Sequence, residues 1–374
     1  MSKSLYIHIP FCRRKCPYCD FYSISYDKAL SSTFIKILSS QIEKLPNDFS
    51  TVYIGGGTPS VLSKPLFLQL FKSLNEKIKK ASEVTIESNP ESLSKEKIEL
   101  FLDNGINRLS IGLQSLEDGK LKKLGRIHTS AKAVESVFLA KKCGFNNISV
   151  DMIFGVWGQT LNKWKSELKE IIKLPIEHIS TYALTYERGT PLFKSLKEKR
   201  IFPLAESAVA DMYEFAMSYL PKQGFMQYEV SNFAKKRFAC RHNLIYWDNG
   251  YYLGLGPSAV SFTNRVRTRN VSGVIKYIEK IAHEQDPFEF KERLSEEKFA
   301  HETAALKIRT SKGIDFSWFN KQTGFDFVRL EKEVLDELVD KELLKYKKVK
   351  GKDVGVYLSR KGFLFADTAS SSLL

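Results

Sequence analysis

The first half of the chain alternates between short apolar segments and longer segments of mixed polarity. Six segments have the composition of buried strands, and the stretches between them are long enough for helices. The expected strands cover residues 5–9, 51–54, 84–87, 108–111, 148–153 and 178–183, and the expected helices include residues 30–45, 65–79 and 131–142. This alternation predicts a parallel sheet covered by helices. Periodicity alone does not choose between an open sheet and a partial barrel.

Three cysteines follow directly on the first expected strand. Cys12, Cys16 and Cys19 have the spacing C-x3-C-x2-C. Three thiolates this close together can bind three irons of a [4Fe-4S] cube and leave the fourth iron without a protein ligand. A structural zinc site is an alternative that normally needs four ligands, and only His8 could supply the fourth. A disulfide framework is typical of small domains in oxidising compartments, which a chain of 374 residues with five cysteines does not resemble.

Length and composition indicate a globular protein of two domains. Hydrophobic residues make up 43% of the chain and charged residues 27%, as in ordinary globular proteins. No apolar run approaches the roughly 18 residues of a membrane helix. The first four residues lead straight into the first expected strand and leave no room for a targeting segment. We therefore expect a cytoplasmic protein.

The net charge of +15 raises the question of an anionic partner. A charge of this size would suit nucleic acid, anionic lipid or a polyanionic small molecule. Lysine, however, is spread along almost every segment instead of being concentrated in one arm. A diffuse charge sets solubility and non-specific attraction, so it does not by itself predict a binding site.

Further candidate residues lie at or after the ends of the expected strands, where parallel α/β folds place their ligand sites. Three consecutive glycines at 55–57 follow the second strand, and glycine lets the backbone approach a ligand closely, although a plain tight turn is the alternative. Pro90 ends the third strand just after Glu87 presents a carboxylate. Gln114, Arg126 and Asp151 follow in the next units. Taken singly, each could equally be a helix cap or a surface ion-pair partner.

The cysteine motif and its flanks resemble the radical S-adenosylmethionine superfamily. Tyr18 stands just before the last cysteine, as in the superfamily signature. The flanking segments 6–11 and 17–21 are similar to the branch that contains oxygen-independent coproporphyrinogen III dehydrogenase, also called the oxidase, and the HemW-type heme chaperones. The resemblance extends from residue 6 to near residue 362. It implies a partial (β/α)6 barrel followed by a small winged-helix-like domain.

The resemblance also implies two cofactors and their binding residues. A [4Fe-4S] cluster would be bound by the three cysteines, and its electron would cleave S-adenosylmethionine to a 5′-deoxyadenosyl radical. The residues that match the family's cofactor pocket are Tyr6, Tyr18, Gly56, Gly57, Thr58, Glu87, Gln114, Arg126 and Asp151. One position departs from the family pattern, because Trp157 stands where proline is usual. Tryptophan cannot reproduce the fixed φ of proline, so we expect this loop to differ in shape.

A second motif lies at residues 240–247, where His242 is followed by Tyr246 and Trp247. A histidine beside aromatic side chains could ligate heme iron while the rings cover the macrocycle. The alternative is a buried aromatic corner with a hydrogen-bonded histidine. The pattern His-Asn-x-x-Tyr-Trp resembles the motif associated with heme binding in the HemW-type branch, which implies heme iron at His242. We expect His178, at the start of a strand, to be structural.

The last part of the chain changes character. We expect a core at residues 1–235, a connecting segment with the second motif at 236–289, and a winged-helix-like domain at 290–374. In the last domain, helices are expected at 296–306, from 313–315 and across 327–338, and a hairpin at 346–349 and 354–358. Such a domain could bind DNA. Its helix is rich in acidic residues that phosphate would repel, so no nucleic-acid partner is expected.

One position separates the two activities of the branch. The dehydrogenase carries a further cysteine where this chain has Phe21. The early start of the first strand and the motif at His242 also favour a chaperone that binds heme and delivers it to apoproteins, such as respiratory haem proteins. The alternative is radical decarboxylation of coproporphyrinogen III, and whether the chain is an enzyme stays open. An electron donor is an expected partner, and the resemblance also allows peripheral membrane contact and a homodimer.

Overall fold

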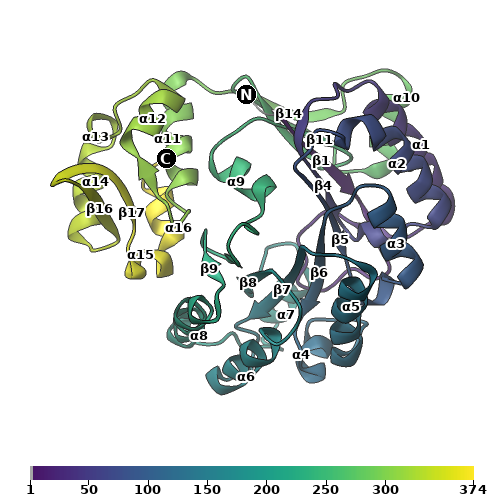
Figure 1. The fold of residues 1–374 in the computed structure, drawn as a ribbon, viewed down its shortest axis with the longest axis horizontal. Helices are drawn as coiled ribbons and strands as arrows, with labels where there is room; N and C mark the ends of the chain where they lie inside the picture. Colours follow the sequence, from purple (N-terminus) through teal and green to yellow (C-terminus); the bar gives the residue numbers. More distant parts are fainter. Residues whose placement is uncertain (1–2) are drawn as a thin grey trace.

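The computed structural model describes residues 3–374, so the expectation about how Met1 and Ser2 lead into the first strand lies outside the described residues. Six parallel strands lie side by side in chain order within a twelve-stranded sheet (Figure 1). They are β1 (Lys3–Ile9), β4 (Phe49–Gly56), β5 (Glu83–Ser88), β6 (Arg108–Gln114), β7 (Ile148–Phe154) and β8 (His178–Ala183). All six expected strands are confirmed. Several are longer than expected, because backbone pairing continues beyond the apolar run into polar residues and glycines.

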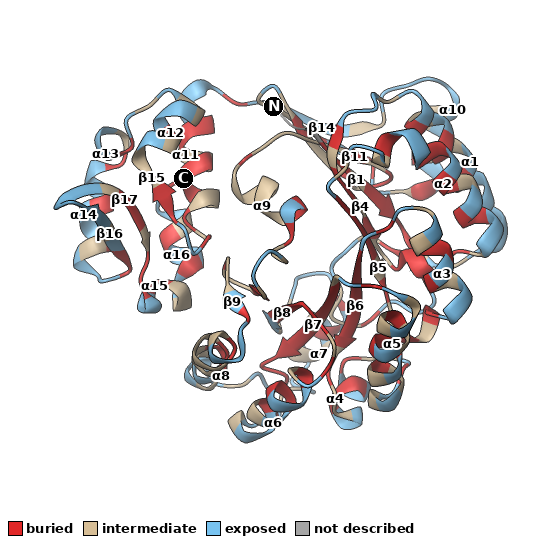
Figure 2. Cartoon of the chain, viewed as in Figure 1, coloured by how far each residue is buried: buried red, intermediate tan, exposed pale blue. Residues whose placement is uncertain are grey.

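Helices cover the outer, convex side of this curved sheet (Figure 1). They are α1 (Lys28–Glu43), α2 (Lys64–Ile78), α3 (Lys95–Asp103), α4 (Asp118–Lys123), α5 (Ser130–Cys143), α6 (Leu161–Ile171) and α8 (Glu206–Tyr219). The short helix α7 (Pro191–Lys197) begins beside the cysteine loop, where the N–H of Leu192 donates to the carbonyl of Pro17 at 2.9 Å. The three helices named from the sequence are present, with ends shifted by one or two residues. Helix α1 begins early because the Asp27 carboxylate accepts the backbone N–H of Leu30 at 2.7 Å. Figure 2 shows the buried sides of these helices turned towards the sheet.

The strands present apolar side chains on one face and polar side chains on the other. Alternate residues, such as Leu5 and Ile7 on β1 or Val84 and Ile86 on β5, belong to the main hydrophobic core. The intervening positions, which point to the opposite face, are largely polar: Tyr6, His8, Thr51, Tyr53, Thr85, Glu87, Arg108, Ser110, Ser149, Asp151, His178 and Ser180. The partial barrel therefore has a polar interior, and the hydrophobic core lies between the sheet and its helices.

Both edges of the sheet carry strands that the sequence did not predict. Beside β1 lie β11 (Tyr252–Leu255), β12 (Val260–Thr263), β13 (Val266–Asn270) and β14 (Phe288–Arg293), and beside β8 lie β10 (Asn232–Ala234) and β9 (Met226–Gln227). Helix α10 (Val274–Ala282) packs against α1. Helix α9 (Arg241–Trp247), which carries the second motif, lies between the concave side of the sheet and the C-terminal part of the chain (Figure 1). Within residues 3–374, no helix is long and apolar enough to cross a membrane.

The C-terminal part has its own hydrophobic core, formed by residues from Ala300 to Leu373. It contains α11 (Glu296–Lys307), α12 (Phe316–Thr323), α13 (Phe327–Leu330), α14 (Lys332–Asp340), α15 (Arg360–Leu364), α16 (Ala366–Ser371) and a sheet of β15 (Ile314–Asp315), β17 (Lys352–Leu358) and β16 (Leu344–Val349). The expected hairpin is confirmed. The helix expected from 313–315 begins instead at Phe316, because Asp315 pairs with β17 and caps the helix through the N–H of Trp318 at 3.0 Å.

Candidate functional site

The three cysteines lie in a short loop at the carboxyl end of β1. Cys12 belongs to β2 (Phe11–Cys12), and a turn closed by the N–H of Cys19 on the carbonyl of Cys16 at 3.1 Å brings the other two together. All three thiols are free, and Cys12 and Cys16 are each 8% exposed. Among the described residues, no three His, Cys, Asp or Glu side chains converge on one point as a single metal ion requires. A [4Fe-4S] cube does not need that convergence, because each cysteine binds a different iron.

The glycine turn after β4 packs directly on the cysteine loop. The N–H of Gly57 donates to the carbonyl of Ile9 at 2.9 Å. A Cβ atom at Gly57 would lie only 2.7 Å from the carbonyl oxygen of Phe11 and 3.0 Å from Cys12 Sγ. Gly56 has a φ of +113°, which residues with side chains rarely adopt. Glycine is therefore required here to seat the cysteine loop, whichever ligand the turn also contacts.

Arg126 connects the loop after α4 to the cysteines. Its Nη1 donates to Cys16 Sγ at 3.6 Å, and its Nη2 donates to Asn89 Oδ1 at 2.5 Å and to the carbonyl of Gly112 at 3.0 Å. Tyr18, which precedes Cys19 in the cysteine loop, packs on the apolar cluster that includes Leu124, and burial raises its pKa. The guanidinium thus places a fixed positive charge beside a cysteine sulfur. A positive charge in this position favours the thiolate form that binds iron.

Two carboxyl groups lie on the polar face of the sheet, Glu87 on β5 and Asp151 on β7, with β6 between them. Glu87 accepts the hydroxyl of Tyr53 at 2.7 Å and the N–H of Gly56 at 3.1 Å. Burial raises the pKa of Glu87 to about 7 against the lowering effect of the Tyr53 hydrogen bond. Burial also raises the pKa of Asp151, which accepts the hydroxyl of Ser110 at 3.5 Å. A cationic ligand would compensate both carboxylates, as the ammonium and sulfonium groups of S-adenosylmethionine would.

Gln114 ends β6 in a strained conformation. Its φ is +63°, and the pairing of β6 with β7 is irregular between Ile111 and Gln114. A positive φ in a residue other than glycine costs energy and is common at functional sites. The Gln114 amide nitrogen and Nη2 of Arg126 both lie next to Gly112, where an added Cβ atom would be 2.9 Å and 3.6 Å from them.

The remaining predicted residues lie on the same side of the sheet. Tyr6 shares a hydrogen bond of 3.0 Å with His8 Nδ1, and its ring lies 6.2 Å from that of Tyr53. The hydroxyl oxygen of Thr58 lies 3.5 Å from Cys12 Sγ. The sequence reasoning did not single out Tyr53. The available sequence signal was a tyrosine between Val52 and Ile54 in an apolar strand.

The loop that carries Trp157 is held without the proline usual in the family. Its main-chain carbonyl accepts Lys123 Nζ at 2.7 Å, and the same amine lies 5.9 Å from the indole centroid. Glycines on both sides, Gly155 and Gly158, have φ values of +75° and +72°. Trp157 packs on a small apolar cluster that also includes Leu124.

His242, the candidate heme ligand, is 1% exposed on the concave side of the sheet. Its Nδ1 lies 2.8 Å from the hydroxyl of Thr51, and its Nε2 lies 2.8 Å from that of Tyr246. Thr51 donates its own proton to Ser4 at 2.9 Å, so the network assigns the His242 proton to Nδ1. Burial, helped by the charge of Arg108, lowers the pKa of His242 to about 3. The imidazole is therefore neutral, and its Nε2 lone pair accepts the Tyr246 hydroxyl.

Helix α9 is fastened at both ends. The Glu83 carboxylate accepts the backbone N–H groups of Arg241 and His242 at 3.0 Å each, which satisfies the first turn of the helix. At the other end, Asp248 forms an ion pair with Lys307 of α11 at 2.5 Å. Trp247 lies 5.3 Å from the guanidinium of Arg309. The helix thus connects the barrel to the C-terminal part.

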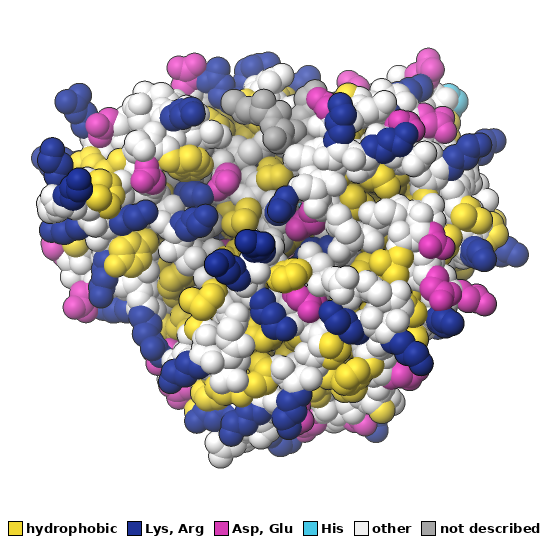
Figure 3. Space-filling model, in the orientation of Figure 1, with side chains coloured by type: hydrophobic (Ala, Val, Ile, Leu, Met, Phe, Trp, Pro, Cys, Tyr) yellow, Lys and Arg dark blue, Asp and Glu magenta, His cyan; other side chains and the backbone are white. Residues whose placement is uncertain are grey.

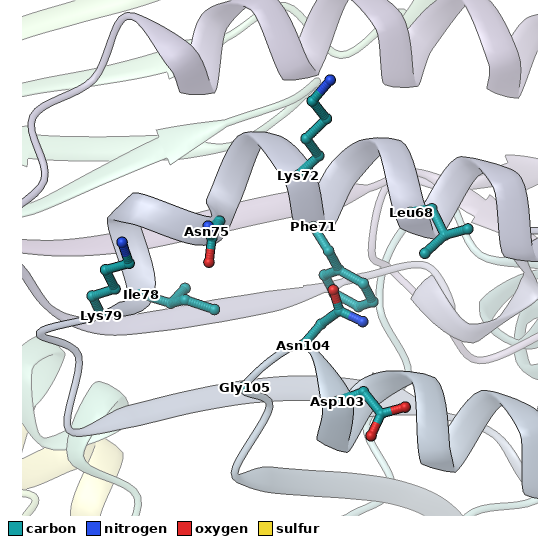
Figure 4. Close-up of a pocket in the computed structure, with 9 residues that line it drawn as sticks. All are labelled: Leu68, Phe71, Lys72, Asn75, Ile78, Lys79, Asp103, Asn104 and Gly105. Atoms are coloured by element: carbon teal, nitrogen blue, oxygen red, sulfur yellow. The ribbon is translucent and has the colours of Figure 1, made fainter.

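A cavity of about 630 Å³ lies elsewhere, between α2 and α3 on the outside of the sheet (Figure 4). It is lined by Leu68, Phe71, Lys72, Asn75, Ile78, Lys79, Asp103, Asn104 and Gly105. None of the residues predicted for the site lies in it. Figure 3 shows Lys and Arg scattered over the visible face, which agrees with the diffuse charge expected from the sequence.

Comparison with known proteins assigns the class of the protein. The model of the radical SAM superfamily matches residues 6–171, the part from β1 to the end of α6. The structure is also similar to the solved structure of coproporphyrinogen III oxidase (HemN) from Escherichia coli, a radical SAM enzyme. The TM-score is 0.84 at 19% identity, over 100% of this chain and 90% of that chain. The chain is a radical SAM protein, and the expected partial barrel is confirmed.

Two relatives narrow the class to a family. The chain is 34% identical to the heme chaperone HemW of Bacillus subtilis (strain 168) over 380 aligned residues, which cover 100% of this chain and 99% of that protein. It is 34% identical to the heme chaperone HemW of Escherichia coli (strain K12), over 77% of this chain and 80% of that protein. The chain therefore belongs to the HemW family. Membership of the superfamily implies a [4Fe-4S] cluster and S-adenosylmethionine as cofactors.

Proposed function

We propose that this protein is a heme chaperone, which binds heme and transfers it to apoproteins such as respiratory haem proteins. The observation that carries the proposal is its 34% identity to a protein named heme chaperone HemW along the full length of both chains. Phe21, which is 70% exposed, supports it, because the dehydrogenase pattern has a cysteine at that position. The proposal includes a cytoplasmic location, where thiols such as the five free cysteines stay reduced.

The residues present fit the two implied cofactors. Cys12, Cys16 and Cys19 would bind three irons of the cluster, and Glu87 and Asp151 would face the positive groups of S-adenosylmethionine. When bound, such a cluster supplies the electron that cleaves the cofactor. The protein's own contribution would be the charged side chains of Glu87, Asp151 and Arg126, which would bind and orient S-adenosylmethionine beside the cysteine loop. An external electron donor is required for any turnover.

Heme would be bound at α9 through His242. The imidazole is already neutral, as an iron ligand must be. Its Nε2 becomes available once the hydroxyl of Tyr246 leaves, and the ring of Tyr246, which packs edge to face on that of Tyr252 with centroids 4.6 Å apart, would offer an aromatic surface to the macrocycle. Binding therefore requires α9 to move away from β4, because His242 is buried in this conformation.

The oxidative decarboxylation of coproporphyrinogen III is the second candidate function. The fold similarity to coproporphyrinogen III oxidase, with a TM-score of 0.84, favours it. The chain would then use the same cysteines and carboxylates on a porphyrinogen substrate. The missing cysteine at Phe21 is the observation against it.

One anaerobic experiment separates the two functions. The iron–sulfur cluster is reconstituted, and the sample is divided between a heme titration and an assay with coproporphyrinogen III and S-adenosylmethionine. We expect a saturable Soret shift and no protoporphyrinogen IX. Formation of protoporphyrinogen IX would overturn the chaperone proposal.

A matched pair of histidines tests the heme ligand. His178, like His242, is buried and forms a hydrogen bond with each ring nitrogen. Its Nδ1 lies 2.8 Å from the hydroxyl of Ser149, and its Nε2 lies 2.8 Å from that of Tyr228. We expect His242→Ala to weaken heme binding and to change the Soret maximum, while His178→Ala binds heme as the wild type does. Equal loss in both variants would show that His242 only supports the fold.

A further inference from the structure

Asn89 bridges two residues of the candidate site with both ends of its amide. Its Nδ2 donates to the hydroxyl of Thr58 at 2.9 Å, and its Oδ1 accepts Nη2 of Arg126 at 2.5 Å. An amide both donates and accepts, so these two contacts fix which way the side chain is turned. Gly112 leaves room for it, because a Cβ atom there would lie 2.8 Å from Asn89 Oδ1.

Each partner of Asn89 reaches a different cysteine. The hydroxyl of Thr58 lies 3.5 Å from Cys12 Sγ, and Nη1 of Arg126 lies 3.6 Å from Cys16 Sγ. The contacts form a continuous chain that runs from Cys12 through Thr58, Asn89 and Arg126 to Cys16. The two ends of this chain are the first two cysteines of the C-x3-C-x2-C motif.

We propose that Asn89 is a positioning residue that sets the spacing of Cys12 and Cys16 and holds Arg126 towards the iron–sulfur cluster. The inference rests on the proposed function in so far as that function requires the cluster. Hydrogen bonds and charges beside cluster sulfurs control both the retention of the cluster and its reduction potential. Because a reduced cluster carries one more negative charge, the Arg126 guanidinium stabilises the reduced state.

Three substitutions test this role. Asn89→Leu keeps the approximate volume and removes both contacts. Asn89→Asp keeps an acceptor for Arg126 but adds a negative charge that offsets its positive charge. Asn107→Ala is the matched control, because Asn107 also bridges two groups, accepting the N–H of Val84 at 2.8 Å and donating to the carbonyl of Ser82 at 3.5 Å, at the opposite end of β5.

The measurements are iron content after anaerobic reconstitution, the rate of iron release to a chelator, and the midpoint potential of the cluster. We expect Asn89→Leu to release iron about ten-fold faster than the wild type, a typical effect of removing a residue that supports metal ligands. Asn89→Asp should lower the midpoint potential, and Asn107→Ala should match the wild type in both. Urea unfolding of the iron-free proteins checks that all variants fold.

The possible outcomes distinguish a wrong cofactor assignment from a wrong role for Asn89. A wild type that takes up no iron–sulfur cluster would overturn the cofactor assignment together with the role of Asn89. A wild type that loads the cluster, with Asn89 variants unchanged in iron release and potential, would overturn the role of Asn89 alone. An effect of Asn107→Ala as large as that of Asn89→Leu would also overturn it, because it would indicate a general loss of stability.

Discussion

Tyr53 on β4 donates its hydroxyl to Glu87 on β5 across 2.7 Å, on the polar face of the sheet. The contact stabilises the ionised carboxyl group, but burial outweighs it and leaves the pKa of Glu87 at about 7. The site thus contains a carboxyl group that titrates near neutral pH. Its charge state depends on whether a cation is bound beside it.

Glu87→Gln should make the stability of the ligand-free protein less sensitive to pH. The unfolded chain loses the Glu87 proton near the ordinary pKa of 4.5 and the folded chain near 7, so the folded state binds more protons between these values. The contribution of Glu87 to the free energy of unfolding therefore falls as pH rises through this window, by at most about 3 kcal/mol. We expect urea unfolding to show Glu87→Gln gaining stability relative to the wild type between about pH 5 and about pH 8. A difference that is constant with pH would contradict the raised pKa of Glu87. Glu229, whose pKa burial also raises to about 7, is present in both proteins and cancels in the comparison.

Tyr246→Phe should increase heme affinity. The substitution removes the hydroxyl that donates to Nε2 of His242, and one hydrogen bond of this kind corresponds to about a 2- to 10-fold change in affinity. Heme titration followed at the Soret band measures the change. Tyr277→Phe is the control, because it removes a buried hydroxyl of α10 that donates to Gln41 at 2.8 Å, away from α9, and should leave heme binding unchanged. Weaker binding by Tyr246→Phe would argue against ligation through Nε2.

Gln114→Gly and Gln114→Ala should differ in stability although both lack the amide. Alanine keeps the strain of a φ of +63° and glycine relieves it, so the glycine variant should be more stable by about 1 kcal/mol. Urea unfolding of the iron-free proteins gives this difference. Both variants should bind S-adenosylmethionine more weakly than the wild type. Equal stabilities would mean that the backbone at position 114 relaxes once the glutamine is gone.

Gly57→Ala should impair uptake of the iron–sulfur cluster. The added methyl group would press on the backbone of Phe11 and on Cys12 Sγ, and such overpacking costs about 1–3 kcal/mol. Iron content per chain after reconstitution is the measurement. Gly119→Ala serves as the control, because its Cβ would meet only Glu117 Oε1, at an ordinary 3.6 Å. Normal iron content in Gly57→Ala would show that the cysteine loop can shift.

The barrel strands were predictable because the signal is local. Each parallel strand alternates apolar residues such as Val84 and Ile86 with polar ones such as Glu87, and the intervening stretches have the length and caps of helices. Of the edge strands that were missed, β9 and β10 have only two and three residues, and β13 and β14 carry charged residues in place of an apolar run. Pairs such as Tyr252 with Ser4 join segments far apart in the sequence, and no local pattern encodes such pairing.

In the candidate site, too, some residues have a local sequence signal and others do not. Cysteine spacing, consecutive glycines and residues such as Glu87 after a strand are visible in the sequence. The contacts of Asn89 and Tyr53 are made with side chains of other strands and loops, so they are visible only in the structure. The environment of His242 was one of two alternatives in the sequence reasoning. Its two hydrogen bonds match the buried, hydrogen-bonded alternative in this conformation, while ligation of heme stays a prediction.

The attachment of α9 at both ends has a thermodynamic consequence. Glu83 fastens its first turn to the barrel, while Asp248 and Trp247 fasten its last residues to α11 and Arg309. Exposure of His242 and loosening of the C-terminal part are therefore linked equilibria, because the contacts at Lys307 and Arg309 oppose both. A docked partner that weakens those contacts would lower the free energy needed to uncover the histidine without touching it.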